Sequence, residues 1–200
     1  MLYAKRERFN KISNFCGRIF SKICSSPNIW TAFGIIPAVL SFYFLVKQNF
    51  LIAAGFFILT AIIDFIDGSV ARVTKRVSNF GAYLDTVVDR VTEFIILFGL
   101  YLIEYPDILW PTRLWLFFLL FGSLMTTYVK AAAFEKKIVN KEIRGGILER
   151  GERMMLLLLI IVLSNYSLVY AAILIMLTTI VANLSALQRF IIAIKQWGFA

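Results

Sequence analysis

The chain has 200 residues, of which 60% are hydrophobic and 16% are aromatic, and its mean hydropathy is +0.80. So few polar residues cannot cover the surface of a water-soluble domain, which excludes a soluble enzyme or binding module. The net charge of +9 comes from basic residues that lie beside apolar blocks, and no nucleic-acid-binding motif accompanies them. We therefore expect one helical membrane domain that meets anionic membrane lipids and phosphorylated ligands, with no nucleic-acid partner.

The N-terminal residues 1–26 predict a juxtamembrane helix. From residue 2 to residue 24, apolar side chains recur about every three or four positions among basic ones, a pattern typical of an amphipathic helix at a membrane interface. A basic tail without fixed structure is the alternative. Charges recur through Lys22 and a Ser-Ser-Pro run follows, so we expect no cleaved signal peptide. The basic residues are Lys5, Arg6, Arg8, Lys11, Arg18 and Lys22.

The cysteine and histidine content limits the kinds of site that the chain can hold. Cys16 and Cys24 are the only cysteines, and the chain has no histidine. This composition supports neither a disulfide framework nor a metal site built from His and Cys. We expect both thiols to be structural.

Six apolar segments follow, at residues 28–47, 49–71, 81–104, 112–134, 147–164 and 168–190. Each is close to the roughly 20 residues that cross a hydrocarbon core of about 30 Å. The sequence thus predicts an all-α integral membrane bundle of six transmembrane helices over residues 27–200, preceded by the N-terminal amphipathic helix. Acidic residues interrupt the end of the second segment and the start of the third, so these two charged ends should meet on one side of the membrane.

The distribution of Lys and Arg predicts the orientation. With the N-terminus in the cytoplasm, only Lys47 and Arg113 of the 21 basic residues fall on the outer side. We therefore expect a multi-pass protein of the cell membrane whose active site, at the junction of the second and third segments, opens to the cytoplasm.

Four of the five aspartates lie between positions 64 and 89. Asp64 and Asp67 are three residues apart and Asp85 and Asp89 are four apart, so each pair shares one face of its helix. Clustered carboxylates near a membrane would repel one another unless divalent cations neutralised them. A site made only of oxygen ligands suits Mg²⁺ or Mn²⁺ rather than zinc.

Small residues and one arginine stand between the aspartate pairs. Gly68, Ala71 and Gly81 let a nucleotide or a neighbouring helix approach the backbone closely. Arg72 can form paired hydrogen bonds with phosphate oxygens. Together with the carboxylates, these residues predict a site for a diphosphate.

Residues 64–89 read DFIDGSVARVTKRVSNFGAYLDTVVD and match the pattern D-x2-D-G-x2-A-R-x8-G-x3-D-x3-D. This pattern resembles the signature of the CDP-alcohol phosphotransferase family, and the six segments together with Pro27, Asn28 and Thr31 extend the resemblance. The resemblance implies a CDP-linked donor whose diphosphate bridges two metal ions, an alcohol acceptor, release of CMP, and a homodimer.

The resemblance also implies roles for individual residues. By their positions in the motif, the metal ligands are Asp64, Asp67, Asp85 and Asp89, and Asp89 is also the general base that removes the acceptor's hydroxyl proton. Likeness assigns CDP binding to Asn28, Thr31, Asp64, Asp67, Gly68, Ala71, Arg72, Gly81 and Asp85. The alternative from the residues alone is that the carboxylates form ion pairs that tie helix ends together, with Arg72, Lys75, Arg76 and Arg90. For Arg90 and Glu93, which are not fixed positions of the motif, a structural ion pair is as good an explanation as contact with the substrate.

A basic surface after the fourth segment predicts an anionic acceptor, such as a phosphorylated polyol. TYVKAAAFEKK and ILERGER resemble segments of the phosphatidylinositol-phosphate and archaetidylinositol-phosphate synthase branch, with departures at Ala132, Phe134 and Gly151. By that likeness, the candidates for binding the acceptor phosphate are Thr127, Lys130, Arg150 and Arg153. The same basic surface includes Lys136, Lys137, Lys141 and Arg144. The general excess of basic residues in cytoplasmic loops is the alternative explanation, above all for Lys136, Lys137 and Lys141.

We therefore expect a synthase that joins a CDP-linked lipid, CDP-diacylglycerol or CDP-archaeol, to inositol 1-phosphate. Glycerol 3-phosphate and serine are the alternative acceptors. A transporter is a more distant alternative, since intramembrane carboxylates also mark ion paths, but the sequence lacks the repeated halves common in transporters. A structural membrane protein without activity is a third, which the intact motif disfavours.

Overall fold

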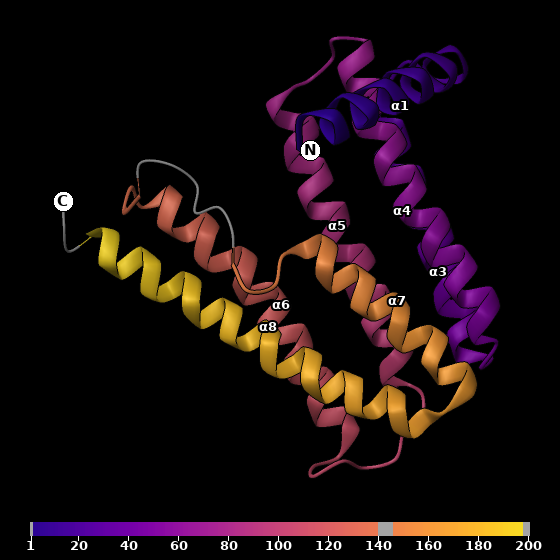
Figure 1. The fold of residues 1–200 in the computed structure, drawn as a ribbon, viewed down its shortest axis with the longest axis vertical. Coiled ribbons are helices and arrows are strands. Elements are labelled where there is room, and N and C mark those ends of the chain that lie inside the picture. The colour runs from indigo at the N-terminus through magenta and orange to yellow at the C-terminus, as the bar shows by residue number, and fades with distance from the viewer. Residues whose placement is uncertain (1, 140–145, 198–200) are drawn as a thin grey trace. The chain divides into compact units, whose positions relative to one another are not determined.

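The computed structural model describes residues 2–139 and 146–197, and every regular element within these ranges is an α-helix (Figure 1). An isolated bridge between Ile108 and Trp110 is the one extended pairing described. The expected acceptor-side residues Lys141 and Arg144 lie outside the described residues. The helices are α1 Leu2–Ile23, α2 Pro27–Phe33, α3 Ile35–Val46, α4 Phe50–Val73, α5 Asn79–Tyr101, α6 Thr112–Glu135, α7 Arg150–Tyr166 and α8 Leu168–Trp197.

The chain divides into two compact units. The first comprises Met1–Lys47 and Ile52–Ile96, and the second comprises Gln48–Leu51 and Leu97–Ala200. The first unit therefore holds α1 to α3, nearly all of α4 and most of α5. The second unit holds α6, α7 and α8.

The first apolar segment is two helices rather than one, with a break at Gly34. Pro37 has no amide hydrogen, so the carbonyl of Phe33 cannot accept the usual helical bond from it. Gly34 instead ends α2, and its N–H bonds to the carbonyls of both Trp30 and Thr31 at 3.1 and 3.2 Å. Pro27 occupies the first position of α2, where no amide donor is needed.

Helix α4 is the central element of the first unit. The Ser41 hydroxyl of α3 donates to the Ala53 carbonyl of α4 at 2.8 Å, and Phe44 stacks on Phe56 with ring centroids 5.4 Å apart. On another part of α4, the hydroxyls of Ser13 from α1 and Ser69 are 2.9 Å apart. Helix α4 is thus held by α3 near its beginning and by α1 near its end.

A tight turn over residues 74–78 connects α4 to α5. Lys75 has a positive φ of 56°, and its N–H bonds to the Arg72 carbonyl at 3.3 Å. The N–H of Arg76 bonds to the Ala71 carbonyl at 3.0 Å. This pair of bonds is a Schellman motif, which ends a helix and satisfies its last carbonyl groups. The turn brings the start of α5 beside the end of α4.

In the second unit, α6 and α8 run side by side (Figure 1). The amide of Asn183 donates to the Phe118 carbonyl at 3.0 Å, and the Thr179 hydroxyl donates to the Trp115 carbonyl at 3.0 Å. A methyl group on Gly122 would lie 2.9 Å from the Asn183 side chain, so the two helices approach closely there. Small and hydroxyl-bearing residues at helix crossings are typical of membrane bundles.

Within the described residues, four stretches are long and apolar enough to cross a membrane: Pro27–Val46, Phe50–Val73, Thr112–Glu135 and Leu168–Trp197. Large apolar side chains stand exposed along them, including Leu51, Phe117 and Leu184 at 54, 59 and 50%. Helices α5 and α7 occupy the remaining two expected segments, but α5 carries four charged residues between positions 85 and 93 and α7 has only 17 residues. The count of six spans and the interfacial position of α1 stay predictions.

Candidate active site

Three carboxylates from two helices meet in the first unit. Asp64 lies on α4, whereas Asp85 and Asp89 lie on α5, and one oxygen from each falls within 4.8 Å of the other two. The Asp89 side chain is buried with 7% exposed, and Asp64 and Asp85 are half-buried. The structure therefore brings together three of the four aspartates on which the sequence-based hypothesis depends.

The fourth aspartate, Asp67, lies one turn after Asp64 on α4 and is also 7% exposed. The Thr31 side chain of α2 reaches its carboxylate, while the Thr31 hydroxyl donates to the Pro27 carbonyl at 3.2 Å. The charge of Asp67 interacts with those of Asp64 and Asp85. The Oδ2 atom of Asp67 is buried and has no hydrogen-bond partner among the described residues. A buried charged oxygen without a donor is costly, so this atom is suited to receive a cation.

The donor set of this acidic cluster fits a hard divalent cation. Oxygens bound to one Mg²⁺ at about 2.1 Å lie roughly 3–4 Å apart, so oxygens already within 4.8 Å need only small side-chain rotations. Carboxylate oxygens without nitrogen or sulfur suit Mg²⁺ or Mn²⁺. The buried and unpartnered Oδ2 of Asp67 offers a further ligand on the same side of α4.

Arg72 lies beside Gly68 at the end of α4. A methyl group on Gly68 would lie 3.4 Å from the Arg72 Nη1 atom, so the guanidinium extends over this glycine. The Nη2 atom donates to the hydroxyls of Ser13 at 2.8 Å and Ser69 at 3.3 Å. Because the side chain is exposed, the guanidinium remains accessible to a ligand's phosphate oxygens.

Two residues of α2, Asn28 and Thr31, contact this region. A methyl group on Gly81 would lie 3.2 Å from the Asn28 Oδ1 atom and 3.2 Å from the Ser78 hydroxyl. Thr31 reaches Asp67 as described above. The start of α2 therefore lies against both halves of the motif, at residues that the sequence analysis connected to the site only through a family resemblance. Ala71, half-buried on α4, lies two turns after Asp64 on the same face.

Several cations near the motif have partners other than its aspartates. Arg76 donates to the carbonyl and the hydroxyl of Ser25 at 3.2 and 3.1 Å, which ties the turn after α4 to the segment before α2. Arg90 forms an ion pair with Glu93, which is 2% exposed. The structure thus favours the structural interpretation for Arg90 and Glu93.

The expected acceptor-side residues lie in the second unit. Thr127 and Lys130 are half-buried on α6, and Arg150 is half-buried at the start of α7. Arg153, one turn later, is only 2% exposed and is among the largest fully buried side chains. The Glu152 carboxylate accepts a hydrogen bond from the Glu149 N–H at 2.8 Å, which caps the helix that carries both arginines.

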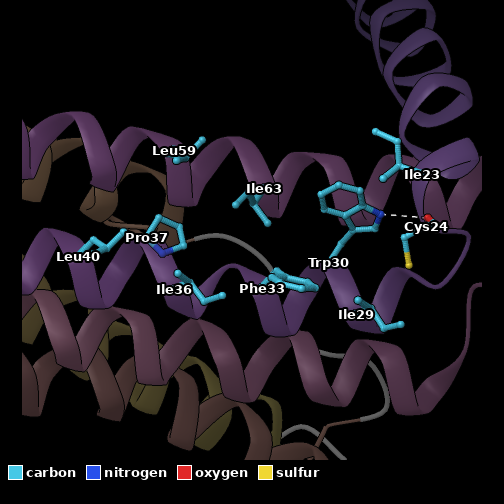
Figure 2. A pocket seen from close by; sticks show the side chains of 10 residues that line it. All are labelled: Ile23, Cys24, Ile29, Trp30, Phe33, Ile36, Pro37, Leu40, Leu59 and Ile63. Carbon is cyan, nitrogen blue, oxygen red and sulfur yellow. Dashed lines mark hydrogen bonds between the residues drawn. The ribbon is translucent and has the colours of Figure 1, made fainter.

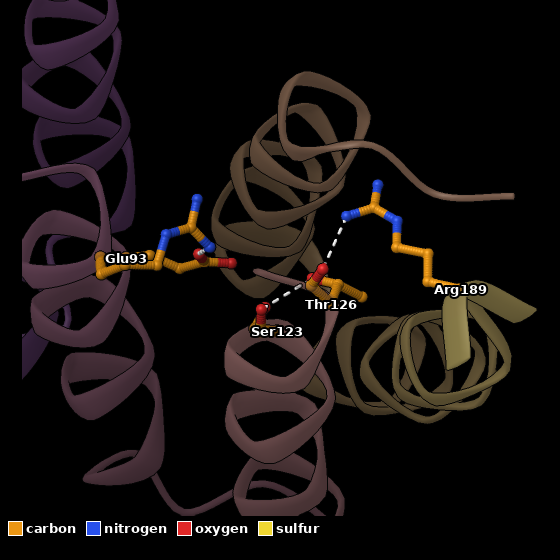
Figure 3. Close-up of polar contacts among 5 residues, drawn as sticks. Glu93, Ser123, Thr126 and Arg189 are labelled. Atoms are coloured by element: carbon orange, nitrogen blue, oxygen red, sulfur yellow. Dashed lines mark hydrogen bonds and ion pairs between the residues drawn. The ribbon is translucent and has the colours of Figure 1, made fainter. Parts of the chain in front are cut away.

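Arg189 on α8 is a residue that the sequence analysis did not single out. Its Nη1 atom donates to the Thr126 carbonyl of α6 at 2.8 Å (Figure 3). The side chain is 9% exposed, its charge interacts with those of Arg153 and Glu149, and its Nε atom has no hydrogen-bond partner among the described residues. Two neighbouring buried guanidinium groups are suited to bind an anion. The sequence feature that could have identified Arg189 is its position as the single charged residue in the apolar segment 168–190.

The sequence is similar to those of known membrane enzymes. The sequence model described as CDP-alcohol phosphatidyltransferase matches residues 24–188. The archaetidylinositol phosphate synthase of Aeropyrum pernix is 27% identical over 198 residues, covering 92% of this chain and 94% of the relative.

Two crystal structures of the Mycobacterium tuberculosis phosphatidylinositol phosphate synthase resemble the fold. The structure with bound CDP-DAG has a TM-score of 0.79 and 22% identity, covering 92% of this chain and 94% of that one. The complex with manganese and citrate has a TM-score of 0.80 and 21% identity, with coverage of 90% and 88%. At this identity, the likeness shows the fold.

Proposed function

Because this chain belongs to the CDP-alcohol phosphatidyltransferase family, we propose that it joins a CDP-linked lipid to inositol 1-phosphate and releases CMP. The chain is a membrane-bound phosphotransferase of phospholipid synthesis, and the proposal concerns its donor, its acceptor and the residues that act on them. The observation that carries the proposal is the approach of the Asp64, Asp85 and Asp89 oxygens to within 4.8 Å of one another.

In the proposed reaction, the acceptor hydroxyl oxygen attacks the phosphorus atom that carries the lipid. A new bond forms between that oxygen and the phosphorus, the bond from the phosphorus to the CMP oxygen breaks, and CMP leaves. The hydroxyl proton passes to the carboxylate of Asp89, which acts as general base. Two divalent ions, held by Asp64, Asp67, Asp85 and Asp89, would neutralise the charge of the diphosphate and of the attacking and leaving oxygens.

The residues around the acidic cluster are suited to hold the CDP group. Gly68 and Gly81 have no side chain that would keep a nucleotide from the backbone, and Ala71 has only a methyl group. Arg72 lies over Gly68 with an exposed guanidinium, in position for the diphosphate oxygens. The Thr31 side chain reaches the Asp67 carboxylate, and Asn28 lies against Gly81.

An apolar groove in the first unit suits one hydrocarbon chain of the donor lipid (Figure 2). The groove has a volume of about 410 Å³ and lies between α2 and α3 on one side and α4 on the other. Trp30, whose indole N–H donates to the Cys24 carbonyl at 3.0 Å, directly precedes Thr31, and Ile63 directly precedes Asp64. The groove thus begins beside the acidic cluster. Its lining residues are Ile23, Cys24, Ile29, Trp30, Phe33, Ile36, Pro37, Leu40, Leu59 and Ile63.

The buried arginines of the second unit support an anionic acceptor. Arg153 and Arg189 are almost fully buried and close enough for their charges to interact. Such a pair is stabilised by a bound anion, and the phosphate of inositol 1-phosphate supplies one. In this proposal Thr127, Lys130 and Arg150 contribute further contacts to the same phosphate. A neutral acceptor such as serine would bring no negative charge to the two guanidinium groups.

The proposal includes the location and assembly of the enzyme. The excess of Lys and Arg on one side of the predicted spans supports an active site at the cytoplasmic face of the cell membrane. We propose a homodimer on the strength of the family resemblance alone.

A panel of donors and acceptors tests the proposed function. Purified protein in detergent with Mg²⁺ or Mn²⁺ is given CDP-diacylglycerol or CDP-archaeol together with inositol 1-phosphate, glycerol 3-phosphate or serine. We expect CMP release to be fastest with inositol 1-phosphate and the lipid product to carry the inositol phosphate. Faster turnover with another acceptor would overturn the acceptor assignment. Undiminished activity in excess chelator would overturn the metal-dependent mechanism.

A further inference from the structure

Ser13 of α1 lies at the centre of a chain of hydrogen bonds that ends on Arg72. The Ser69 hydroxyl donates to the Phe65 carbonyl at 2.7 Å, which uses its only proton. The Ser13 hydroxyl, 2.9 Å from that of Ser69, must then be the donor of this pair, and its oxygen accepts from Arg72 Nη2 at 2.8 Å. Ser13 is 2% exposed, so this arrangement is shielded from water.

The close approach of α1 to α4 depends on Gly17, one turn after Ser13. A methyl group on Gly17 would lie 2.5 Å from the Ser69 carbonyl oxygen and 2.7 Å from Val73 Cγ2. Real side chains do not approach a carbonyl so closely, so any larger residue would push α1 away from α4. Gly17 therefore sets the distance at which the Ser13 hydroxyl reaches Arg72.

Hydrogen bonds hold one end of the Arg72 guanidinium beside Gly68. Nη2 donates to Ser13 and, at the longer distance of 3.3 Å, to Ser69. A methyl group on Gly68 would lie closer to Nη1 than to Nη2, at 3.4 against 3.8 Å, on the helix face that carries Asp64. A long arginine side chain samples many rotamers, and a fixed one loses less entropy when its ligand binds. The bond to Ser13 thus selects the orientation in which Nη1 faces the diphosphate site.

We propose that Ser13 is a positioning residue that orients Arg72 for the diphosphate of the CDP-linked donor. This inference rests on the proposed function of Arg72. The matched family region begins at residue 24, so Ser13 and Gly17 lie outside it. Helix α1 is then a structural part of the donor site, in addition to its expected contact with the membrane surface.

Binding of CDP, without any acceptor, provides the test. The Kd for CDP is measured by isothermal titration of the purified full chain with Mn²⁺ present. We expect Ser13→Ala to raise the Kd roughly 3- to 10-fold, since Nη2 loses the bond to Ser13 and keeps the longer bond to Ser69. Ser21→Ala is the matched control, because among the described residues the Ser21 hydroxyl bonds only to the Arg18 carbonyl of its own helix. Its Kd should equal that of the wild type.

Further variants separate positioning from loss of packing. Gly17→Ala should raise the Kd like Ser13→Ala although the hydroxyl is still present, and Ser13→Thr, which keeps the hydroxyl, should restore most of the affinity. Arg72→Ala should weaken binding more strongly, and Ser13→Ala should add nothing in the Arg72→Ala background. With saturating donor, kcat and the KM for the acceptor should remain unchanged in Ser13→Ala. When the donor concentration is varied instead, the KM for the donor should rise.

Three outcomes would overturn the inference. The first is an unchanged Kd in Ser13→Ala together with a raised Kd in Arg72→Ala, which would leave Ser13 with a packing role only. The second is an equal loss of affinity from Ser13→Ala with and without Arg72. The third is an unchanged Kd in Arg72→Ala. If the wild-type chain itself does not bind CDP, the proposed function fails first, and this result is distinct from the other three.

Discussion

The Thr31 side chain of α2 reaches the carboxylate of Asp67 on α4, while its hydroxyl donates to the Pro27 carbonyl at 3.2 Å. The Oδ2 atom of Asp67 is buried and without a partner among the described residues. Thr31 follows Trp30 of the apolar groove directly in sequence. Thr31 therefore connects the proposed lipid-binding wall to the acidic cluster.

Replacing Thr31 with Val should weaken metal binding while keeping the side-chain shape. Loss of an outer-shell contact to a metal-binding carboxylate reduces metal affinity or activity by about 10-fold or more. We expect the Mn²⁺ concentration for half-maximal CMP release to rise by about this factor. Thr60→Val is the matched control, because the Thr60 hydroxyl also donates to a carbonyl of its own helix, that of Phe56 at 3.1 Å, away from the acidic cluster. Equal Mn²⁺ dependence in both variants would contradict the assigned role of Thr31.

Asp89→Asn should abolish turnover with the fold retained. The amide is nearly the same size as the carboxylate but cannot accept the acceptor's proton, and loss of a general base lowers rates by about 10²- to 10⁴-fold. The measurement is kcat for CMP release, with the melting temperature in detergent as the check on folding. Asp107→Asn provides the comparison, since Asp107 is the fifth aspartate and lies in the loop before α6, where it accepts a bond from the Thr112 N–H at 3.3 Å. A kcat for Asp89→Asn within 10-fold of the wild type would argue against the base assignment.

Arg153→Ala should act on the acceptor and leave the donor unaffected. Removal of one of two buried guanidinium groups takes away a charge-assisted bond to the acceptor phosphate, which corresponds to a rise in KM of roughly 10- to 100-fold for inositol 1-phosphate. The KM for the CDP-linked lipid should not change. Arg113→Ala, which removes a cation 6.0 Å from the Tyr101 ring in the same unit, should change neither constant. An unchanged acceptor KM in Arg153→Ala would favour a neutral acceptor.

Gly122→Ala should destabilise the packing of α6 on α8. The added methyl group would lie 2.9 Å from the Asn183 side chain and 3.1 Å from its backbone nitrogen, so the helices must separate. Overpacking of this kind costs about 1–3 kcal/mol. Gly55→Ala provides the opposite case, because nothing lies within 4 Å of the added group and alanine favours helix. We expect a lower melting temperature for Gly122→Ala and an equal or higher one for Gly55→Ala.

Tyr105 should make the stability of the protein depend on alkaline pH. Burial raises the pKa of Tyr105 to about 12, although its hydrogen bond to Ser164 acts in the opposite direction. Since the folded-state pKa exceeds the unfolded value of 10.0, the stabilising contribution is complete below pH 10 and is lost as the pH rises towards 12.

The test compares melting temperatures of the wild type and Tyr105→Phe between pH 8 and pH 11. At pH 8, the variant should be less stable because it lacks the 2.8 Å bond to Ser164. Above pH 10, the wild type should lose stability faster and the difference should shrink. Tyr166→Phe, at a tyrosine that is 74% exposed, controls for the substitution itself. A difference in melting temperature between the wild type and Tyr105→Phe that stays constant from pH 8 to pH 11 would disprove the raised pKa of Tyr105.

The helices could be predicted from the sequence because apolar blocks and charged junctions mark them directly. The expected segment 112–134 became α6 Thr112–Glu135, and the segment 49–71 became α4 Phe50–Val73. The approach of Asp64 to Asp85 and Asp89 could also be predicted from the sequence. The i,i+3 spacing of Asp64 and Asp67 and the i,i+4 spacing of Asp85 and Asp89 put each pair on one face of its helix. The break at Gly34 did not follow from hydropathy, which does not register the missing amide hydrogen of Pro37.

The contacts of α1 were beyond the reach of sequence patterns. The amphipathic pattern drew attention to the basic and apolar residues, whereas the contact with α4 is made by Ser13 and Gly17. Small residues leave little trace in an amphipathic pattern, and their importance depends on which helix lies opposite. Arg189 was overlooked for a similar reason, because its partners Thr126 and Arg153 come from two other helices.

The turn after α4 explains why the eight residues between Arg72 and Gly81 must keep their number. That interval contains the last residue of α4, the turn at residues 74–78 and the first two residues of α5, so it holds no slack loop. One inserted residue that is wound into α4 or α5 would rotate the rest of that helix by roughly 100°. The carboxylates of α5 would then turn away from those of α4. The motif's spacing therefore sets the rotation of α5 relative to α4 at which the carboxylates of the two helices face each other.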